Sequence, residues 1–200
     1  MRDKILVLVF TAVLSIPAVA WSRGHHPYHR WAYGEHAPAA QTIRVDSNVI
    51  VAFSPHGDAT RVIVNAIDHA RRQILVQAYG FSSRPILQAL ALAHRRGVEV
   101  RVILDKSNQT ERYSGATYMM NNGIPVYIDG RVRIAHNKVM IFDGVAVLTG
   151  SFNFTRAAQD ENAENILLVE DSPELARAYI RDWKWRLSQS HPYGRRVSRF

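Results

Sequence analysis

The stretch from Ile134 to Asn165 reads IAHNKVMIFDGVAVLTGSFNFTRAAQDENAEN, and we expect the rest of the chain to hold it in place. The residues around His136 are mostly β-branched or bulky and apolar, which predicts a strand over residues 132–142. Side chains two positions apart on a strand face the same way, so the imidazole of His136 and the ammonium of Lys138 should project from one face. A nucleophile or proton carrier beside a fixed positive charge suits the chemistry of a phosphate group.

The composition is that of one globular domain. The chain has 200 residues, of which 47% are hydrophobic, and this is enough to bury a sizeable core. It contains no cysteine, which excludes a disulfide framework, a cysteine-based zinc site and a thiol nucleophile. The formal net charge of +8 predicts a polyanionic partner, which is either a nucleic acid or an anionic lipid surface.

The N-terminus has the three-part pattern of a secretory signal peptide over residues 1–20. A short basic region is followed by a continuous apolar run over residues 5–16 and by the small residues Ala18 and Ala20. The alternative is an uncleaved membrane anchor, but the apolar stretch is shorter than the roughly 20 residues that a spanning helix needs. We therefore expect a protein that is secreted across the inner membrane and resides in the periplasm.

Three further segments follow the signal peptide. Residues 21–46 show no apolar periodicity and are rich in Gly, Pro, His and aromatic residues, which predicts a flexible leader. Residues 47–190 should form the catalytic domain, and residues 191–200 a basic tail. The leader histidines could bind a divalent metal, although a solvated tail is the simpler interpretation: His25, His26, His29 and His36.

The order of the expected elements indicates an α/β (α+β mixed) fold. Strands over residues 48–53, 73–79 and 98–104 alternate with helices that begin after Asp58, at Ser83 and Pro85, and near Arg112, which demands parallel strands with crossover helices. Further strands are expected over residues 125–128, 132–142, 145–149 and 165–169, before a last helix that begins at Ser172. The pairs Asp129-Gly130 and Asp143-Gly144 predict hairpins among these. We expect a single mixed β-sheet flanked by helices on both faces.

The polar residues of the opening stretch form an ordered motif. It resembles the motif of the phospholipase D superfamily, and in particular that of its small, secreted bacterial endonucleases, which carry one motif per chain. The resemblance spans roughly residues 47–190 and implies a phospholipase D/nuclease-like fold and phosphodiesterase activity. The motif residues are His136, Lys138, Asp143, Gly150, Ser151, Asn153 and Glu164.

The resemblance assigns catalytic roles to three of these residues. His136 is the expected nucleophile, and its attack on phosphorus would give a phosphohistidine intermediate. Lys138 would hold phosphate oxygens and stabilise the charge of the transition state. Glu164 would accept a hydrogen bond from His136 and fix its tautomer. Glu161 is a competitor for this role, but Glu164 directly precedes an apolar strand and has the spacing found in the family.

The other motif residues bind the phosphate or support the site. Asn153 would donate to the phosphate, and Ser151 would either donate to it or brace its neighbours. Asp143 lies in an Asp-Gly hairpin signature, where an aspartate needs no catalytic explanation, so we assign it a structural role. Gly150 is assigned to the support of the motif, and a simple turn would also explain the Gly150-Ser151 pair.

A single motif leaves the reaction without an acid. The leaving oxygen needs a proton, and water must then be activated to release the intermediate. No second His-x-Lys occurs in the chain, so we expect a homodimer with His136 from both subunits in one site. The two histidines would titrate as a coupled pair and give a bell-shaped pH–rate profile. The scheme requires no metal and no cofactor, because Lys138 of both subunits supplies the positive charge.

These observations predict a metal-independent phosphodiesterase, most simply a non-specific endonuclease that hydrolyses DNA, with RNA left open. One alternative is a phospholipase D-type lipid phosphodiesterase whose partner is membrane lipid, for which Trp183 and Trp185 could provide apolar surface. Another is a non-catalytic module that binds nucleic acid. The arginines that could follow the phosphate backbone are Arg112, Arg131, Arg133 and Arg156.

Overall fold

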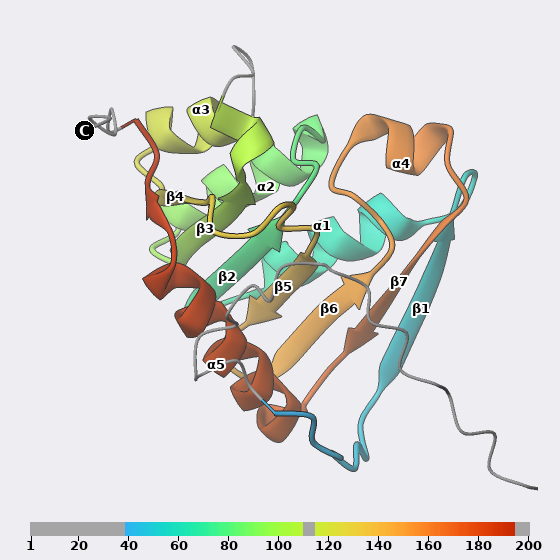
Figure 1. Cartoon of the computed structure of the whole chain (residues 1–200). Helices are drawn as coiled ribbons and strands as arrows, with labels where there is room; N and C mark the ends of the chain where they lie inside the picture. Colours follow the sequence, from blue (N-terminus) through green and yellow to red (C-terminus); the bar gives the residue numbers. More distant parts are fainter. Residues whose placement is uncertain (1–38, 110–114, 195–200) are drawn as a thin grey trace, which may run out of the picture. The chain divides into compact units, whose positions relative to one another are not determined.

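A computed structural model describes residues 39–109 and 115–194 (Figure 1). Residues 1–38, which hold the expected signal peptide and the leader histidines, lie outside the described residues, as do Arg112 and residues 195–200. The strands are β1 (Val49–Ser54), β2 (Gln73–Ala78), β3 (Glu99–Asp105), β4 (Val126–Asp129), β5 (Lys138–Phe142), β6 (Ala146–Gly150), β7 (Glu164–Val169) and β8 (His191–Pro192). The helices are α1 (Ala59–His69), α2 (Arg84–Arg95), α3 (Gly115–Asn121), α4 (Arg156–Asp160) and α5 (Pro173–Ser188), with a 3-10 turn η1 (Lys106–Gln109).

The described strands form one mixed sheet in the order β1-β7-β6-β5-β2-β3-β4-β8. Strands β2, β3 and β4 are parallel neighbours, and the helices α2 and α3 make the crossovers between them. The other neighbouring pairs are antiparallel. The predicted fold class, a mixed sheet with helices on both faces, is confirmed.

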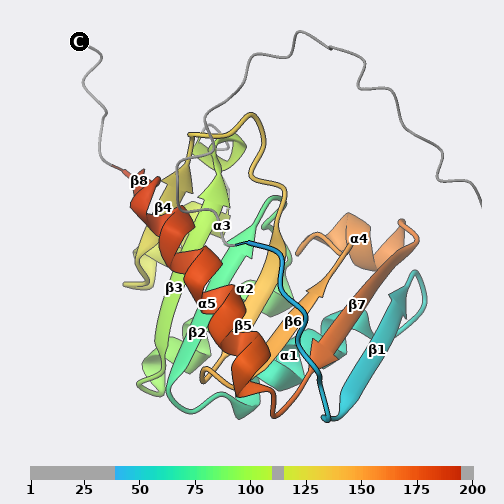
Figure 2. The same cartoon turned by 60° about the horizontal axis from the view of Figure 1, so that its bottom comes forward.

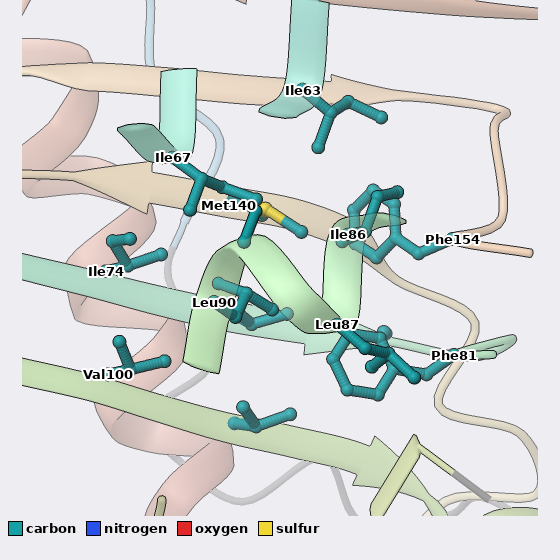
Figure 3. Close-up of a cluster of buried hydrophobic side chains, with 14 of the residues drawn as sticks. Ile63, Ile67, Ile74, Phe81, Ile86, Leu87, Leu90, Val100, Met140 and Phe154 are labelled. Carbon is teal, nitrogen blue, oxygen red and sulfur yellow. The ribbon is translucent and has the colours of Figure 1, made fainter. Parts of the chain in front are cut away.

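Two apolar cores lie on the two faces of the sheet. Helices α1, α2 and α3 cover one face with the larger core, part of which is seen in Figure 3. Helix α5 crosses the other face over a smaller core that includes Trp183 (Figure 2). On the central strand β2, Ile74 and Val76 enter the larger core and Leu75 enters the smaller one. Burial on both faces explains why three consecutive residues of this strand, over residues 74–76, are apolar.

The predicted helix ends are largely correct. Pro85 lies in the first turn of α2, where its missing N–H costs no hydrogen bond, and Gly97 follows the helix with φ of 92°. Asp58 precedes α1 as predicted, but its carboxylate makes no capping bond. It pairs instead with the exposed guanidinium of Arg61, at 2.6 Å from Nη2.

Of the two predicted hairpins, one is confirmed and the other is wrong. Asp143 and Gly144 join β5 to β6 with φ of 54° and 71°, as a tight antiparallel turn requires. Asp129-Gly130 makes no hairpin, because β4 lies between β3 and β8 and not beside β5. The carboxylate of Asp129 instead binds Arg186 at 2.8 Å and accepts from the N–H of Arg131.

The strand predicted over residues 132–142 is also too long. Strand β5 begins at Lys138, opposite Ala78 at the end of β2, and the preceding residues have no regular secondary structure. Because β2 stops there, residues 130–137 have no strand to pair with. The N–H of Ala135 is satisfied by the carboxylate of Asp105 instead. His136 therefore lies before the strand and not within it.

Three short elements escaped the sequence analysis. The turn η1 and the helix α4 are too short to show an apolar periodicity. The two-residue strand β8, within the segment expected to be a tail, pairs with β4 at Tyr127 and Ile128. Within residues 39–109 and 115–194, no helix is long and apolar enough to cross a membrane.

Asp143 ties the β5–β6 turn to the start of β2. Its carboxylate oxygens accept from the backbone N–H groups of Arg71, Arg72 and Gln73 at 2.7–2.9 Å. Burial alone would raise the pKa of Asp143, but these three N–H donors and the charge of Arg72 outweigh it and hold the pKa below its ordinary value. The ionised carboxylate therefore stabilises the folded state.

Replacing Asp143 by alanine leaves three N–H groups without their acceptor, so the free energy of unfolding at neutral pH should fall by about 1–3 kcal/mol. Because the folded-state pKa is lower than the unfolded-state pKa, this stabilisation is complete above the unfolded-state pKa and is lost as the pH falls through the folded-state pKa. Urea denaturation should therefore show wild type and Asp143→Ala converging at acid pH.

The matched control for this measurement is Asp46→Ala. Asp46 is exposed and makes no hydrogen bond with the described part of the chain. The free energy of unfolding of this variant should therefore differ from that of wild type by no more than about 0.5 kcal/mol. An Asp143→Ala variant as stable as wild type at neutral pH would contradict the structural role of this carboxylate.

Candidate active site

Most of the motif lies where four neighbouring strands end or begin, and we call this line of strand ends the catalytic edge of the sheet. Because β2, β5, β6 and β7 alternate in direction, β2 and β6 end where β5 and β7 begin. His136, Lys138, Ser151, Asn153 and Glu164 all lie at or next to these ends. Asp143 lies at the other end of β5, roughly 16 Å away at the usual rise per residue. The structure thus brings together the five residues predicted to be catalytic or to bind phosphate. Of the two residues predicted to support the motif, Gly150 lies with them at the end of β6, and Asp143 lies apart.

His136 and Lys138 meet at the ring of Tyr79. The exposed imidazole of His136 packs against this ring with a centroid separation of 4.6 Å and an interplanar angle of 55°. The ammonium of Lys138 lies 5.5 Å from the centroid of the same ring and donates to the carbonyl oxygen of His136 at 2.8 Å. The pair is therefore held together by Tyr79 and the backbone, and not by the alternation of a strand.

Tyr79 itself was not predicted. It follows directly after β2 and precedes Gly80, and it is the one aromatic residue of the segment 73–80. Residues that follow a buried strand at the edge of a sheet are frequent in functional sites, and this position is the signal that could have found it.

Lys138 is a buried cation with spare donors. Its side chain is only 7% exposed, and burial lowers its pKa, while the negative charge of Glu164 opposes the shift. An ammonium has three donors, and within the described part of the chain one of them has an acceptor. A phosphate oxygen placed beside this group would take the remaining donors and favour its charged form.

Within the described part of a single subunit, Glu164 interacts with Lys138 and not with His136. Its Oε1 accepts from Asn162 Nδ2 at 3.2 Å, and its charge acts on Lys138. Among the residues that the structure describes, no hydrogen bond joins Glu164 to His136. Its competitor Glu161 is exposed at the end of α4.

Gly150 and Ser151 fix the junction of β6 and β7. Ser151 Oγ accepts from Asn165 N and Asn165 Nδ2 at 3.1 and 3.3 Å, so its hydroxyl braces the start of β7. At Gly150 the φ is 155°, and a Cβ would overlap the carbonyl oxygen of Asn165 and lie 2.9 Å from Cα of Ile166. Only glycine allows the two strands to approach this closely.

Asn153 presents an unsatisfied polar atom. Its Oδ1 is buried without a hydrogen-bond partner in the described part of the chain. Leaving such an atom unpaired costs about 1–3 kcal/mol. A buried polar atom without a partner is therefore a feature of groups that bind a ligand. A Cβ on Gly80 would lie 3.2 Å from Cβ of Asn153, so glycine at this position keeps the amide in place. Rotation of the amide by 180° would present a donor at the same point.

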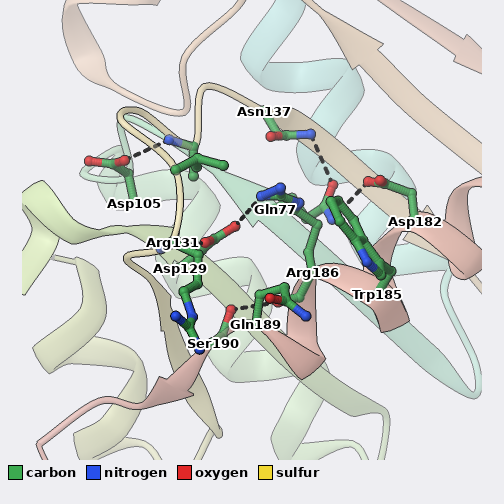
Figure 4. A network of polar contacts seen from close by, with 12 residues as sticks. Gln77, Asp105, Asp129, Arg131, Asn137, Asp182, Trp185, Arg186, Gln189 and Ser190 are labelled. Atoms are coloured by element: carbon green, nitrogen blue, oxygen red, sulfur yellow. Dashed lines mark hydrogen bonds and ion pairs between the residues drawn. The ribbon is translucent and has the colours of Figure 1, made fainter. Parts of the chain in front are cut away.

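A polar network lies behind the motif (Figure 4). Asn137, between the two motif residues, donates to Gln77 Oε1 at 3.3 Å, and Gln77 Nε2 donates to Asp182 of α5 at 3.2 Å. Asp105, at the end of β3, accepts from the N–H of Ala135 at 2.7 Å. These bonds tie the residues before and after His136 to two different elements of the fold.

The surrounding charges and aromatic residues differ in exposure. Arg131 and Arg133 are exposed in the segment that leads to His136, whereas the exposed Arg156 pairs with Asp160 at 3.0 Å. Trp183 is 2% exposed and donates to the carbonyl oxygen of Val76. Of the two tryptophans that could have supplied apolar surface for lipid, Trp183 is thus part of the core, and Trp185 is partly exposed. The ring of Trp185 stacks under the guanidinium of Arg186 at 4.3 Å.

The described residues include no group of three or more His, Cys, Asp and Glu side chains arranged to hold a metal ion. The buried cation in the site is the ammonium of Lys138. Two neighbouring nitrogen groups on one aromatic ring form a site suited to nucleophilic attack on a phosphate diester.

Comparison with known proteins places the chain in a family. The family model described as "Cardiolipin synthase, PLD-like domain" matches residues 63–186. The phospholipase D of Rickettsia felis is 46% identical over 137 residues, which cover 68% of this chain and 68% of that protein. The mitochondrial cardiolipin hydrolase of Xenopus laevis is 34% identical over 132 residues, which cover 65% of this chain and 62% of that protein.

Solved structures give the same result. Nuc from Salmonella typhimurium, a phospholipase D family member, matches with a TM-score of 0.72 and 39% identity over 74% of this chain and 99% of that chain. NucT from Helicobacter pylori shares the fold, with a TM-score of 0.68 and 22% identity over 74% of this chain and 100% of that one. The chain therefore belongs to the phospholipase D superfamily and is a phosphodiesterase, a hydrolase of ester bonds, of the phospholipase D type.

Proposed function

We propose that the protein is a metal-independent endonuclease with low sequence preference that hydrolyses DNA through a phosphohistidine, with RNA as the alternative nucleic-acid substrate. The observation that carries this proposal is the pairing of the exposed imidazole of His136 with the buried ammonium of Lys138 on the ring of Tyr79. We further propose that it acts in the periplasm, as the pattern of residues 1–20 predicts.

The reaction proceeds in two displacements. A nitrogen of His136 attacks phosphorus, and the P–N bond forms as the bond to the leaving oxygen breaks. Lys138 stabilises the charge on the phosphate oxygens, and His136 of the partner subunit gives its proton to the leaving oxygen. Water then attacks phosphorus and loses its proton to that second histidine, while the P–N bond breaks and frees His136.

The burial of Trp183 favours nucleic acid over lipid as the substrate, whereas the positive charge suits either. The chain carries a formal net charge of +8, and Arg131 and Arg133 are exposed just before His136. Trp183, one of the two tryptophans that could have supplied apolar surface to a lipid enzyme, is buried in the core. The second candidate is a lipid phosphodiesterase, and the names of two relatives, phospholipase D and cardiolipin hydrolase, favour it. The completeness of the motif argues against a module that only binds.

Initial rates on single- and double-stranded DNA and on phospholipid vesicles separate the two candidates. We expect wild type to cleave DNA, and His136→Ala to lose this activity by at least about 1,000-fold while it still binds DNA. The control is His69→Ala, since His69 is the exposed last residue of α1, near the Asp143 turn at the other end of β5, and should be dispensable. Turnover of lipid without turnover of DNA would overturn the choice of substrate, and cleavage by His136→Ala would exclude it as the nucleophile.

Metal independence has its own test. Cleavage of DNA should persist in excess EDTA at the rate measured in its absence, because Lys138 supplies the charge that a metal would otherwise provide. The rate should be measured again after addition of Mg²⁺ or Zn²⁺. Loss of activity in EDTA, followed by recovery with a divalent ion, would contradict the mechanism.

The proposed homodimer has support from an apolar face beside the site that residues 39–109 and 115–194 leave uncovered. Val49, Val51 and Phe53 alternate along the edge strand β1, and all are exposed, with Phe53 at 63%. The exposed Leu167 of β7 is the register partner of Val51 and lies on the same face. Helix α5 covers the middle of this side of the sheet and lies away from β1 (Figure 2). Exposed apolar patches of this kind mark interaction surfaces.

A Val51→Asp/Phe53→Asp variant should be monomeric by sedimentation equilibrium and should not cleave DNA. Both side chains are exposed in one subunit, so the variant should keep the stability of the fold. The control is Leu92→Asp on the outer face of α2, which should stay dimeric and active. A monomeric variant that cleaves at the wild-type rate would contradict the proposal that two subunits share one site.

A second measurement reads the contribution of the partner subunit. Wild type is mixed and re-associated with a tenfold excess of His136→Ala subunits. If each site needs both histidines, the activity per wild-type subunit should fall to about a tenth, since most wild-type subunits then pair with an inactive one. Unchanged activity would mean that one subunit suffices.

A further inference from the structure

His136 is poorly fixed by its own contacts with the fold. It lies in residues 130–137, which have no regular secondary structure, and its side chain is exposed. A nucleophile nevertheless has to be held within a fraction of an ångström of the reactive geometry, because small displacements cost large factors in rate. The restraint must therefore come from the residues on either side of it and from the ring that it contacts.

Asp105 holds the peptide on the N-terminal side of His136. It is the last residue of β3, and its side chain is 3% exposed. Its Oδ2 accepts from the N–H of Ala135 at 2.7 Å, and its Oδ1 accepts from the N–H of Ser107 at 2.9 Å. One buried carboxylate thus fixes the turn after β3 and the residue directly before the nucleophile, and Figure 4 shows Asp105 with the second of these contacts.

Tyr79 holds the C-terminal side and the ring. Its N–H donates to the carbonyl oxygen of Asn137 at 3.0 Å, and its ring packs against the imidazole of His136. The buried Asn108 joins the two anchors, because its Nδ2 donates to the carbonyl oxygens of Tyr79 and Asp105 at 2.8 and 3.2 Å. The bonds form one closed set around a segment that is otherwise irregular.

We propose that Asp105 is a positioning residue for the nucleophile and that, with Asn108 and Tyr79, it fixes the imidazole of His136 in the orientation from which it attacks phosphorus. Asp105 acts through the backbone of Ala135. The inference rests on the proposed function, because it concerns the geometry of the same reaction.

The chain offers a matched control in Asp129. It is the register partner of Asp105 on β4 and is also buried. Its Oδ1 likewise accepts from a backbone N–H two residues further on, that of Arg131, but its other oxygen binds Arg186 and not the peptide before His136. An Asp→Asn change at either position leaves one oxygen where two accepted, and it places an NH₂ group against a donor.

The first readout is the His136 ring proton resonance in the NMR spectrum, assigned by its loss in His136→Ala. The nearby ring of Tyr79 shifts this resonance, so it reports the position of the imidazole without any substrate. We expect Asp105→Asn to move it and Asp129→Asn to leave it in place. Tyr79→Leu should remove the ring-current shift, and Tyr79→Phe should restore it. Urea denaturation of each variant shows which are folded.

The second readout is turnover of a small activated phosphodiester, which needs little help from an acid and does not use the DNA-binding surface. Asp105→Asn should lower kcat about 10- to 100-fold with little change in KM, whereas Asp129→Asn should keep the wild-type kcat. If Asp105→Asn does not fold, the comparison of Tyr79→Leu with Tyr79→Phe decides in its place, with the same expected loss and rescue.

An unmoved His136 resonance in folded Asp105→Asn would overturn the inference whatever the activity, and so would equal shifts in Asp105→Asn and Asp129→Asn. If Tyr79→Leu is the variant in use, an unmoved resonance has the same meaning. A wild-type protein that turns over no phosphodiester would defeat the proposed function alone, because the resonances still show whether Asp105 positions the ring.

Discussion

The antiparallel placement of β5 between β2 and β6 is the constraint on which the site depends. It makes two strands end and two strands begin at one edge, so that residues more than 80 positions apart in sequence, such as Tyr79 and Glu164, lie at the same edge of the sheet. Burial on both faces of the sheet keeps this register, because a slip of one residue would exchange the side chains of the two cores. Packing in the two cores thus determines how the residues of the site are arranged.

Buried polar groups then make this end of the strands suited to an anionic ligand. Lys138 is drawn into the fold at the first position of β5, and burial lowers its pKa while Glu164 opposes the shift. Beside it, Asn153 has a buried oxygen without a partner. Both features are unfavourable in the free protein. An anionic ligand would accept from the spare donors of Lys138, and it would accept from Asn153 once the amide is rotated by 180°. A site built in this way discriminates between a charged phosphate and water through interactions that are already oriented.

Much of this could be predicted from the sequence, and the misses have physical reasons. The fold class, the α2 and α5 helices and the Asp143-Gly144 hairpin follow from periodicity and turn chemistry, which are local. The strand predicted through His136 failed because its end is set by a partner, the C-terminal end of β2 at Ala78, and the same apolar pattern continues beyond it. Asp105 was missed because its role arises only where β3 meets the segment before β5 in space, which no spacing in the chain reveals. For Tyr79 the only signal was its position directly after the buried strand β2.

The proposed dimer would complete the site and cover the apolar face that the described residues leave open next to it. One subunit offers one His136 and one Lys138, whereas two displacements at phosphorus need an acid as well as a nucleophile. Phe53 is exposed on β1, and its register partner Asn165 adjoins Glu164 and is braced by Ser151, so the apolar face runs up to the catalytic edge. A subunit that covered this face would lower the local dielectric around Lys138 and bring its own edge close by. Association would then supply the driving force of apolar burial and the missing proton donor in a single step, and a separated subunit would hold a phosphate without being able to cleave it.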